Sequence, residues 1–512
     1  MKLKVKILGF QAGGKHIVII DDDIAEKLDI RSLDRVKIKY MNREIAAIVN
    51  VAKFLPGDII GVYDEVAELL KVREGDVVEI IPAGAPESLL YIRKKLTRAR
   101  LNAYEAKKII EDIVNGYISD VELTALVTAL HYQGMSLEEA LNFTRAMVET
   151  GETLKLPSKI VLDKHSLGGV PGDKTSMIVV PIIASLGYII PKTSSRAITS
   201  AAGTADRMEV LAPVSLEIEE MKKVILKTNG CLVWGGALGL APADDIIIRV
   251  EYPLGIDPFF IPSILAKKLA VGSTHVVLDI PTGRGAKVAT ISEARELAQD
   301  FIQLASHLGI KLEAAVTYGE QPIGHTIGPA LEAKEALMTL MGNGPSDLID
   351  KATSIAGILL EMVGNRNGRE IALHTLQSGK AEKKMREIIE AQGGDPNVKP
   401  EDIEIGNKHF TVYAETDGFV FWINNQALAL IGKTAGSPKD KGAGVYVYTK
   451  LGTKVKKGDP LFTVYAESSV KLHAVEKILE ELNPIAIGSG IQAKMLLEKI
   501  DTRPEKIITL ER

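Results

Sequence analysis

The sequence predicts a multidomain α/β protein. A small N-terminal β-rich domain and a helical domain precede a central, mostly parallel α/β domain and a C-terminal α+β domain. The 512 residues are enough for about three or four compact units. The hydrophobic pattern changes along the chain from strand-like alternation to helical spacing, and then to alternating strands and helices. Stretches rich in proline and glycine separate these regions.

Residues 1–84 form the predicted N-terminal β-rich domain. Short apolar runs such as "VKIKY", "EIAAIVNV" and "GDVVEIIP" alternate with turns that contain glycine and aspartate. This pattern is typical of short strands in a small sheet or barrel.

Residues 85–157 have helical spacing and form the predicted helical domain. Helices from about residue 245 to 275 are expected to join it. The glycines that follow its helices suit C-terminal caps, and its expected N-terminal caps are Asp120, Ser136 and Thr153.

In residues 158–345, the strands "KIVLDKHS" and "HVVLDIP" alternate with helices such as "ISEARELAQDFIQLASHLG". This alternation predicts a mostly parallel sheet, whose ligands bind beyond the carboxyl ends of the strands. Residues 346–405 are expected to be a helical connection, and residues 406–512 a C-terminal α+β domain. In that last domain the segment "GTKVKKGDPL" between two strands resembles half of a lipoyl or biotin carrier, without the lysine that carries the cofactor.

Composition excludes several classes of protein. A net charge of −4 argues against a general nucleic-acid binder. The single cysteine, Cys231, excludes an internal disulfide and a cysteine-rich metal site, and its apolar surroundings indicate a buried side chain. With no signal-peptide pattern and no apolar run of about 18 residues, we expect a cytoplasmic protein without membrane contact.

The segment "DKHSLGGVPGDKTS" (163–176) predicts an anion site at the start of a helix. It is not a Walker A loop, because Asp173 separates Gly172 from Lys174, where that motif requires lysine directly after glycine. A strand, a glycine-rich loop and a helix N-terminus nevertheless present free N–H groups and a favourable dipole to an anion. Lys164 and Ser166 add a positive charge and a hydroxyl group.

A second segment, "PKTSSRAITSAAGTADRMEVL" (191–211), brings further polar groups to the same domain. Its small residues Ala201, Ala202 and Gly203 leave room for a ligand beside the backbone. Two such segments in one α/β domain favour an anion-binding site over a solvated loop.

These two segments identify a family resemblance. The pattern from Ser194 to Glu209 resembles the signature of thymidine and pyrimidine-nucleoside phosphorylases, and "DKHSLGGV" is similar to their phosphate-binding loop. The resemblance extends from about residue 85 to 490. The added N-terminal module and the stretches "VWGGALGLAPADD", "DIPTGRGAKV" and "GEQPIGHTIGPALEA" resemble the archaeal branch that acts on nucleoside 5′-monophosphates.

The resemblance implies specific site residues. The implied phosphate contacts are Lys164, Ser166, Ser176, Ser194 and Thr204. The implied nucleotide contacts are Gly169, Ser195, Arg196, Ala197, Ile198, Thr199, Ser200, Thr204, Ser263, Lys267 and Lys287. For His165, a ligand contact and a supporting hydrogen bond both remain open.

Asp257 matches the proton donor of this branch. A purine that leaves the sugar carries negative charge unless it is protonated, so an acid is required there. We expect burial among Phe259, Phe260 and Ile261 to raise the pKa of Asp257. Without the resemblance, an Asp-Pro pair would more simply be read as a helix cap.

The chain departs from the pyrimidine enzymes in two places. The stretch from Asp257 to Ser263 is two residues shorter. The pyrimidine enzymes hold the base with a tyrosine and an arginine, but here Arg249 is out of step and Glu251 stands near the place of the arginine. Loss of a hydrogen-bond donor to a pyrimidine carbonyl should lower pyrimidine-nucleoside specificity strongly, which favours the nucleotide reading.

The implied reaction is the phosphorolysis of AMP by inorganic phosphate, giving adenine and α-D-ribose 1,5-bisphosphate, with CMP and UMP as further candidate substrates. The resemblance implies no metal or organic cofactor, and a homodimer or higher homo-oligomer formed through the helical domain. Three alternatives stay open: a pyrimidine-nucleoside phosphorylase, an enzyme like anthranilate phosphoribosyltransferase, and a nucleotide sensor without catalysis.

Overall fold

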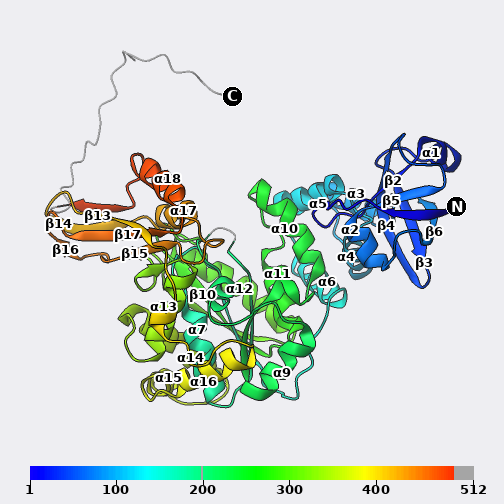
Figure 1. Cartoon of the computed structure of the whole chain (residues 1–512). Coiled ribbons are helices and arrows are strands. Elements are labelled where there is room, and N and C mark those ends of the chain that lie inside the picture. Colours follow the sequence, from blue (N-terminus) through cyan, green and yellow to red (C-terminus); the bar gives the residue numbers. More distant parts are fainter. Residues whose placement is uncertain (198–199, 489–512) are drawn as a thin grey trace, which may run out of the picture.

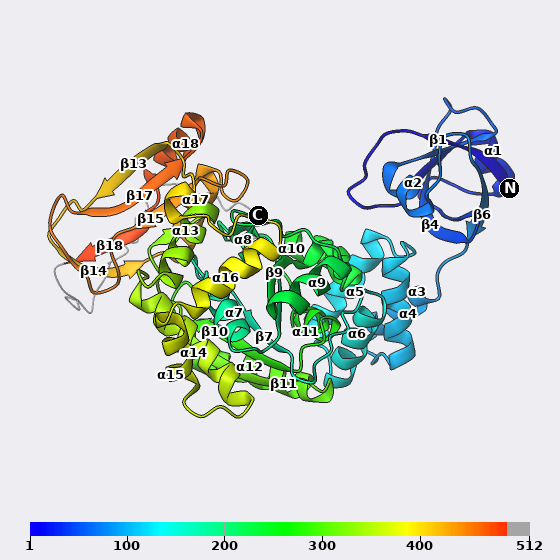
Figure 2. The same cartoon turned by 60° about the horizontal axis from the view of Figure 1, so that its bottom comes forward.

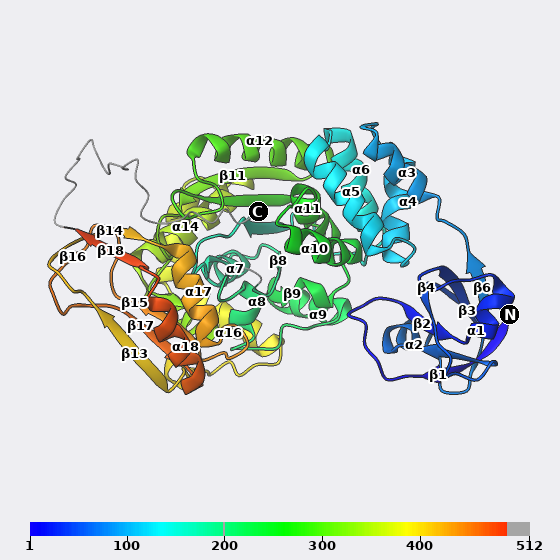
Figure 3. The ribbon, with the colours of Figure 1, turned by 90° about the horizontal axis from the view of Figure 1, so that it is seen from above.

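The computed structural model of the chain describes residues 1–197 and 200–488. The chain folds into units that follow each other in space as they do in sequence (Figure 1). The N-terminal barrel lies at one end beside a helical bundle, the α/β sheet lies in the middle, and the C-terminal sheets lie at the other end (Figures 2 and 3). No helix of the described residues is long and apolar enough to cross a membrane.

The N-terminal strands close into a barrel in the order β1-β5-β2-β4-β3-β6. Alternate side chains point inward, so that Val36 and Ile38 of β3 are fully buried while their neighbours face outward. The elements are β1 (Lys2–Ile7), β2 (Ile17–Ile20), α1 (Asp22–Leu28), β3 (Arg35–Tyr40), β4 (Arg43–Val51), β5 (Ile59–Val62), α2 (Asp64–Leu70) and β6 (Val77–Ala83).

The helical bundle combines two separate parts of the sequence, and its core includes Phe143 and Phe259, whose ring centroids lie 5.1 Å apart. Its helices are α3 (Ser88–Leu96), α4 (Ala103–Val114), α5 (Asp120–Gln133), α6 (Leu137–Glu149), α10 (Pro242–Leu254) and α11 (Phe260–Ala270). Ser136 caps α6 as expected. Asp120 is the first residue of α5 instead of its cap, because the Ser119 hydroxyl accepts the Glu122 N–H. Thr153 caps no helix, since none follows it before β7.

The central sheet is parallel, with β11-β10-β7 and β8-β9 joined by a bridge between Val161 and Ile189. Its strands are β7 (Leu162–Ser166), β8 (Ile190–Ser194), β9 (Gly230–Trp234), β10 (His275–Thr282) and β11 (Lys311–Tyr318). The surrounding helices are α7 (Thr175–Ser185), α8 (Thr204–Met208), α9 (Ile218–Thr228), α12 (Ile291–His307) and α13 (Pro329–Leu340). The predicted multidomain α/β organisation is thus present, with a parallel sheet at its centre.

The helices after residue 345 are α14 (Ser346–Met362), α15 (Gly368–Gln377) and α16 (Lys380–Ala391). These helices are not only the helical connection expected from the sequence, because they also form part of the core of the α/β domain. Leu359 of α14 and Ile388 of α16 are fully buried in one hydrophobic core with Ile182 of α7. These helices therefore cover the α/β sheet, because their apolar faces need α7 as a partner.

The C-terminal domain contains the four-stranded sheet β12-β15-β17-β13 and the three-stranded sheet β16-β14-β18. Its elements are β13 (Lys408–Tyr413), β14 (Gly418–Ile423), α17 (Asn425–Ala435), β15 (Gly444–Val447), β16 (Lys454–Val455), β17 (Pro460–Ala466), α18 (Ser469–Leu479) and β18 (Ile485–Gly488). The edge strand β12 (Thr326–Ile327) comes from the α/β region, and Thr326 pairs with Tyr446 of β15. Backbone hydrogen bonds thus join the two domains.

Candidate active site

The site begins where β7 ends and a glycine-rich loop runs to α7. Lys164 lies near the end of β7 and its side chain is only 2% exposed. Its ammonium group lies 3.8 Å from the Asp173 carboxylate and 3.9 Å from that of Asp279. Burial alone would raise the pKa of Asp173, but the charges of Lys164 and Lys351 outweigh it and hold that pKa well below its usual range. Opposite charges therefore fix the loop around Lys164.

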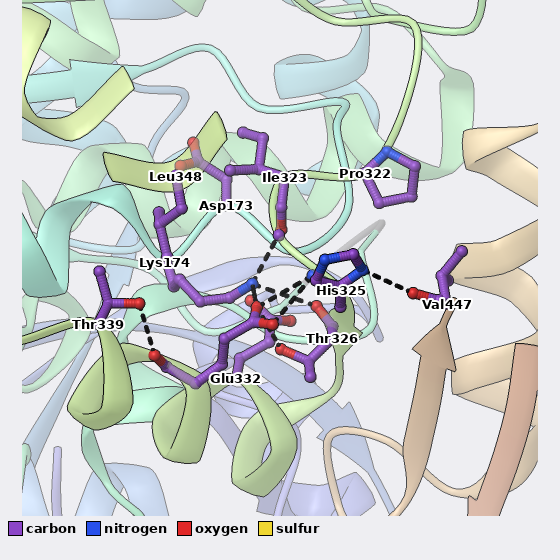
Figure 4. Close-up of polar contacts among 12 residues, drawn as sticks. Asp173, Lys174, Pro322, Ile323, His325, Thr326, Glu332, Thr339, Leu348 and Val447 are labelled. Carbon is purple, nitrogen blue, oxygen red and sulfur yellow. Dashed lines mark hydrogen bonds and ion pairs between the residues drawn. The ribbon is translucent and has the colours of Figure 1, made fainter. Parts of the chain in front are cut away.

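Lys174, the lysine that suggested a nucleotide loop, has a structural role. Its side chain is fully buried, and its Nζ donates to Ile323 O at 2.8 Å and to the Glu335 carboxylate (Figure 4). The lysine therefore anchors the turn before β12 instead of reaching toward an anion. This position agrees with the sequence argument against a Walker A loop.

Arg207 of α8 holds the two polar loops together. Its Nη1 donates to Asp173 O in the first loop at 2.8 Å, and its Nη2 donates to Ala202 O in the second loop at 2.7 Å. Its Nε donates to the buried Glu332 carboxylate. A planar guanidinium can bridge three acceptors in this way, which a lysine cannot do with the same rigidity.

The second loop is ordered by acidic residues that follow it. Asp206 accepts the N–H groups of Ala197 at 2.7 Å and Gly203 at 2.8 Å. Arg196 forms ion pairs with Glu209 and Asp206, and its guanidinium lies 5.0 Å from the Trp234 ring. Hydrogen bonds from Arg196, followed by those from Lys441, lower the pKa of Glu209 to about 2.

The predicted hydroxyl groups have few partners within the protein. Ser176 is buried in the first turn of α7, and Ser194 Oγ lies 3.5 Å from Val233 O. Thr204 Oγ1 accepts a hydrogen bond from Arg207 at 3.4 Å, and Ser166 Oγ accepts one from Gly168 N–H at 3.5 Å. Such long contacts leave these hydroxyl groups able to bind a ligand.

Gly169 and Lys287 meet at one point of the site. Gly169 has φ +87°, and a Cβ atom there would lie 2.8 Å from the Lys287 backbone nitrogen. Only glycine fits this close approach. The exposed Lys287 ammonium lies 5.6 Å from the centre of the Phe260 ring at the start of α11. The α/β loops and the helical bundle therefore come together here.

On α11, Ser263 and Lys267 are four residues apart and share one half-buried face. Lys267 forms an ion pair with the buried Asp244 of α10. The next residue, Lys268, donates to Asp163 of β7 at 2.7 Å. This pair fixes α11 directly against the strand that carries Lys164.

The turn between α10 and α11 carries Asp257 beside Glu251 and Lys287. Desolvation raises the pKa of Asp257, against the opposing charge of Lys287. Burial and then the charge of Asp257 raise the pKa of Glu251 to about 8. The expected rise in the pKa of Asp257 is present, with desolvation as its first cause, although the residue keeps an exposed surface and Phe259 is buried inside the bundle instead of covering it.

Comparison with known proteins gives the family. The description "Glycosyl transferase family, helical bundle domain" matches residues 90–151, and "Glycosyl transferase family, a/b domain" matches residues 158–382. "Pyrimidine nucleoside phosphorylase C-terminal domain" matches residues 419–486. The chain is 59% identical to an AMP phosphorylase of Thermofilum pendens, over the full length of both chains. It belongs to the AMP phosphorylase family.

Other AMP phosphorylases are similar over nearly the same length. That of Thermococcus kodakarensis is 49% identical over 98% of this chain and 99% of its own. Among solved structures, anthranilate phosphoribosyltransferase from Thermus thermophilus matches with a TM-score of 0.50 and 20% identity. It covers 59% of this chain and 98% of its own, and at this identity the likeness concerns the fold alone.

For a member of the AMP phosphorylase family, the structure places the predicted residues in two groups. Lys164, Ser166, Ser176, Ser194 and Thr204 lie on β7, α7, β8 and α8, at the ends of the two loops that Arg207 connects. Gly169, Ser263, Lys267, Lys287 and Asp257 lie where these loops face α11. Ser195 is exposed and Ser200 Oγ donates to Ala202 O at 3.0 Å. The predicted contacts Ile198 and Thr199 lie outside the described residues.

Sequence reasoning missed Arg207 and did not recognise how Glu251 acts. Arg207 follows the threonine of the second loop by three residues, the spacing at which a helical side chain returns over the first turn. This spacing could have identified Arg207 from the sequence, but its three acceptors could not be predicted from it. Arg249 of this protein contacts the N-terminal domain, because its Nη1 donates to Gly13 O.

Proposed function

We propose that this protein catalyses the phosphorolysis of AMP, giving adenine and α-D-ribose 1,5-bisphosphate. The observation that carries the proposal is the full-length 59% identity to an AMP phosphorylase. The site supports it with polar groups for two anions and an acid between them. CMP and UMP are the further substrates to be tested.

The attacking phosphate is held by the loops that Arg207 connects. Lys164 supplies positive charge, and Ser166, Ser176, Ser194 and Thr204 supply hydroxyl donors. Asp173 and Asp279 hold Lys164 in place while no anion is bound. The phosphate then replaces these carboxylates as the nearest electrostatic partner without a rearrangement of the loop, which favours a preorganised site.

The nucleotide lies between the second loop and α11. Ser195, Arg196, Ala197, Ser200 and Thr204 form one side, and Gly169, Ser263, Lys267 and Lys287 the other; the resemblance adds Ile198 and Thr199, which lie outside the described residues. Lys287 is exposed and suited to a 5′-phosphate. Holding both substrates brings a phosphate oxygen within about 3–3.5 Å of C1′ in a reactive pose.

In the reaction, a phosphate oxygen forms a bond to C1′ while the bond from C1′ to the base nitrogen breaks. The electron pair of the broken bond goes to adenine, which takes a proton from Asp257. Desolvation raises the pKa of both Asp257 and Glu251, so this pair of carboxyl groups keeps a proton more readily than two solvated carboxyl groups would. A bound base would cover the exposed Asp257 and favour its neutral form further.

The proposal extends to the organisation of the molecule. The functional units are residues 1–84, 85–157, 158–345, 346–405 and 406–512, the fourth of which packs on the α/β sheet as described. The protein acts in the cytoplasm as a homodimer or higher homo-oligomer formed through the helical domain. Neither a metal nor an organic cofactor is required.

The decisive experiment incubates the full-length protein with AMP and inorganic phosphate. We expect release of adenine in chromatography and a new sugar bisphosphate in ³¹P NMR, both unaffected by EDTA. Turnover of adenosine, thymidine or uridine but not AMP would instead assign a nucleoside phosphorylase. Binding of AMP in calorimetry without release of adenine would leave a sensor, and a requirement for Mg²⁺ with a pyrophosphorylated sugar would indicate a phosphoribosyltransferase.

A further inference from the structure

The helix α17 packs the C-terminal domain against the second loop of the candidate site. It lies on the side of that domain that faces the α/β domain (Figure 3). Ala201 of the second loop is 1% exposed and belongs to the hydrophobic core of the C-terminal domain, together with Leu428 and Ile431 of α17. A Cβ atom at Gly432 would lie only 3.0 Å from the Cβ atom of Ala201. A side chain at position 432 would therefore press on the second loop.

An ion pair connects the same loop with the segment that follows α17. Lys441 Nζ lies 2.9 Å from the carboxylate of Glu209, and this carboxylate also pairs with Arg196. Arg196 is one of the residues expected to contact the nucleotide. The C-terminal domain thus holds the second loop both by apolar packing and by charge.

The other end of α17 supports the loop that carries Lys287. This loop consists of residues 283–287 and follows β10. Asn425 at the start of α17 is 1% exposed, and its Nδ2 donates to Gly319 O at 2.8 Å. The N–H of Gly319 donates in turn to the backbone oxygen of Thr282, the last residue of β10, at 2.9 Å. These two hydrogen bonds fix the start of the 283–287 loop.

Trp422, three residues before Asn425, contacts the same loop through a side chain. The guanidinium carbon of Arg284 lies 4.2 Å from the centre of the Trp422 ring, an arrangement in which the cation and the ring attract each other. The backbone N–H of Arg284 donates to Glu320 Oε1 at 3.2 Å. Arg284 is therefore held by its side chain and by its backbone, three residues before Lys287.

We propose that α17 and Trp422 position the two loops that receive the nucleotide, so that the C-terminal domain sets the spacing of the nucleotide site. The inference rests on the proposed function for the identity of the nucleotide, AMP. Gly432 acts on the second loop and Asn425 on the loop of Lys287. These two residues are seven positions apart, about 10 Å along a helix, so one rigid element fixes both loops. Gly432, Asn425 and Trp422 are positioning residues, which act on AMP through other groups.

The first test replaces Gly432 by alanine in the full-length protein. We expect the KM for AMP to rise by about 10-fold, because the loop of Ala201 must yield to the new methyl group. The KM for phosphate should change less, since Lys164 lies on the other loop. The melting temperature should stay the same or rise, because alanine favours a helix more than glycine does. Structural damage would lower it instead.

A second substitution tests whether the contact itself is responsible. The double variant Gly432→Ala, Ala201→Gly removes the methyl group on which the new one presses, so it should recover most of the affinity for AMP. Gln426→Ala, at an exposed position of the same helix, is the matched control and should keep the wild-type KM. An unchanged KM for AMP in Gly432→Ala, or a rise that Ala201→Gly does not reverse, would overturn the proposal.

Trp422→Leu tests the contact with the other loop, and it also serves if Gly432→Ala does not fold. Leucine fills part of the space but cannot attract the guanidinium of Arg284, so the KM for AMP should rise by about 3-fold to 10-fold. Phe421→Leu changes the exposed neighbour on the same strand and is the matched control. A wild-type KM in Trp422→Leu, or an equal rise in both variants, would count against the proposal.

Hydrogen exchange in the free protein does not depend on catalysis, so it separates failure of this inference from failure of the proposed function. In Trp422→Leu the amides of residues 283–287 should exchange faster than in the wild type, while those of residues 1–84 keep their rates. This result supports the link even if the wild type does not turn over AMP, an outcome that would remove the proposed function alone. Equal exchange of the loop in both proteins would refute the link, whether or not AMP is a substrate.

Discussion

Glu251 accepts a hydrogen bond from the backbone N–H of Phe259 at 3.1 Å, and this contact fixes the turn that carries Asp257. Glu251 is buried, whereas Asp257, two residues before Phe259, is exposed. One carboxyl group thus holds the turn, and the other is the proton donor that we propose. The two groups also influence each other electrostatically.

Replacing Asp257 by asparagine should reduce kcat by about 100-fold or more, because the leaving base loses its proton donor. The KM for AMP should change little, since an amide keeps the size and polarity of the side chain. Steady-state kinetics of adenine release measure both values. A variant with wild-type kcat would remove Asp257 from the reaction.

Glu251→Gln should change how the reaction depends on pH. The raised pKa of Glu251, about 8, means that the protonated form is lost as the pH rises through that value. We therefore expect the wild-type rate to fall above about pH 8. The variant, which cannot ionise there, should lose this limb of its kcat profile and keep a kcat close to that of the wild type at neutral pH.

The raised pKa of Glu251 also predicts how the free energy of unfolding depends on pH. Glu251 has an ordinary pKa near 4.5 when unfolded and about 8 when folded, so the folded state holds the extra proton between these values. Stability should therefore fall as the pH rises from 4.5 to 8 and level off above that range. Urea unfolding of the wild type and of Glu251→Gln at several pH values tests this, because the variant should show a smaller fall.

Arg207→Met should destabilise the protein by about 3–5 kcal/mol, because it leaves the buried Glu332 carboxylate without its partner. Both polar loops should also lose their connection, so the KM for phosphate should rise. The double variant Arg207→Met, Glu332→Gln should recover part of the stability but not the KM. Recovery of both would mean that the arginine serves stability alone.

Lys174→Met and Lys164→Met should behave differently although the two lysines lie at opposite ends of the same loop, between β7 and α7. Lys174→Met should lower stability by about 3–5 kcal/mol, because Glu335 stays buried without a counter-ion. The molecules that remain folded should keep the wild-type KM for phosphate. Lys164→Met should raise that KM instead. Equal effects on phosphate binding would contradict the structural role of Lys174.

Much of the fold followed from local patterns. The strand that ends at Ser166, the glycine-rich loop and the following helix α7 could be predicted because short-range periodicity and glycine positions determine them. The packing of α14 to α16 on the sheet could not, because their helical pattern is the same whether they connect domains or cover one. Tertiary contacts between distant segments decide that question.

The candidate site shows the same division. Spacing alone excluded a Walker A loop, and the structure accounts for Lys174 through Glu335, which is 161 residues away in sequence. The bridge made by Arg207 joins Asp173, Ala202 and Glu332, and no local pattern connects these three. The burial of Phe259 inside the bundle, which leaves Asp257 with an exposed surface, could not be predicted for a similar reason. Apolar neighbours in sequence do not cover a side chain when the turn points it outward.

The pairing of β12 with β15 limits how the chain can be divided. A fragment that ends at residue 405 would lack β15, and it would leave the edge of Thr326–Ile327 open to pairing with other molecules. It would also lack Lys450, whose Nζ donates to Pro322 O at 2.7 Å on the turn that binds Lys174. The C-terminal domain thus supports the turn that binds Lys174, and a shortened protein should aggregate rather than remain folded as a smaller enzyme.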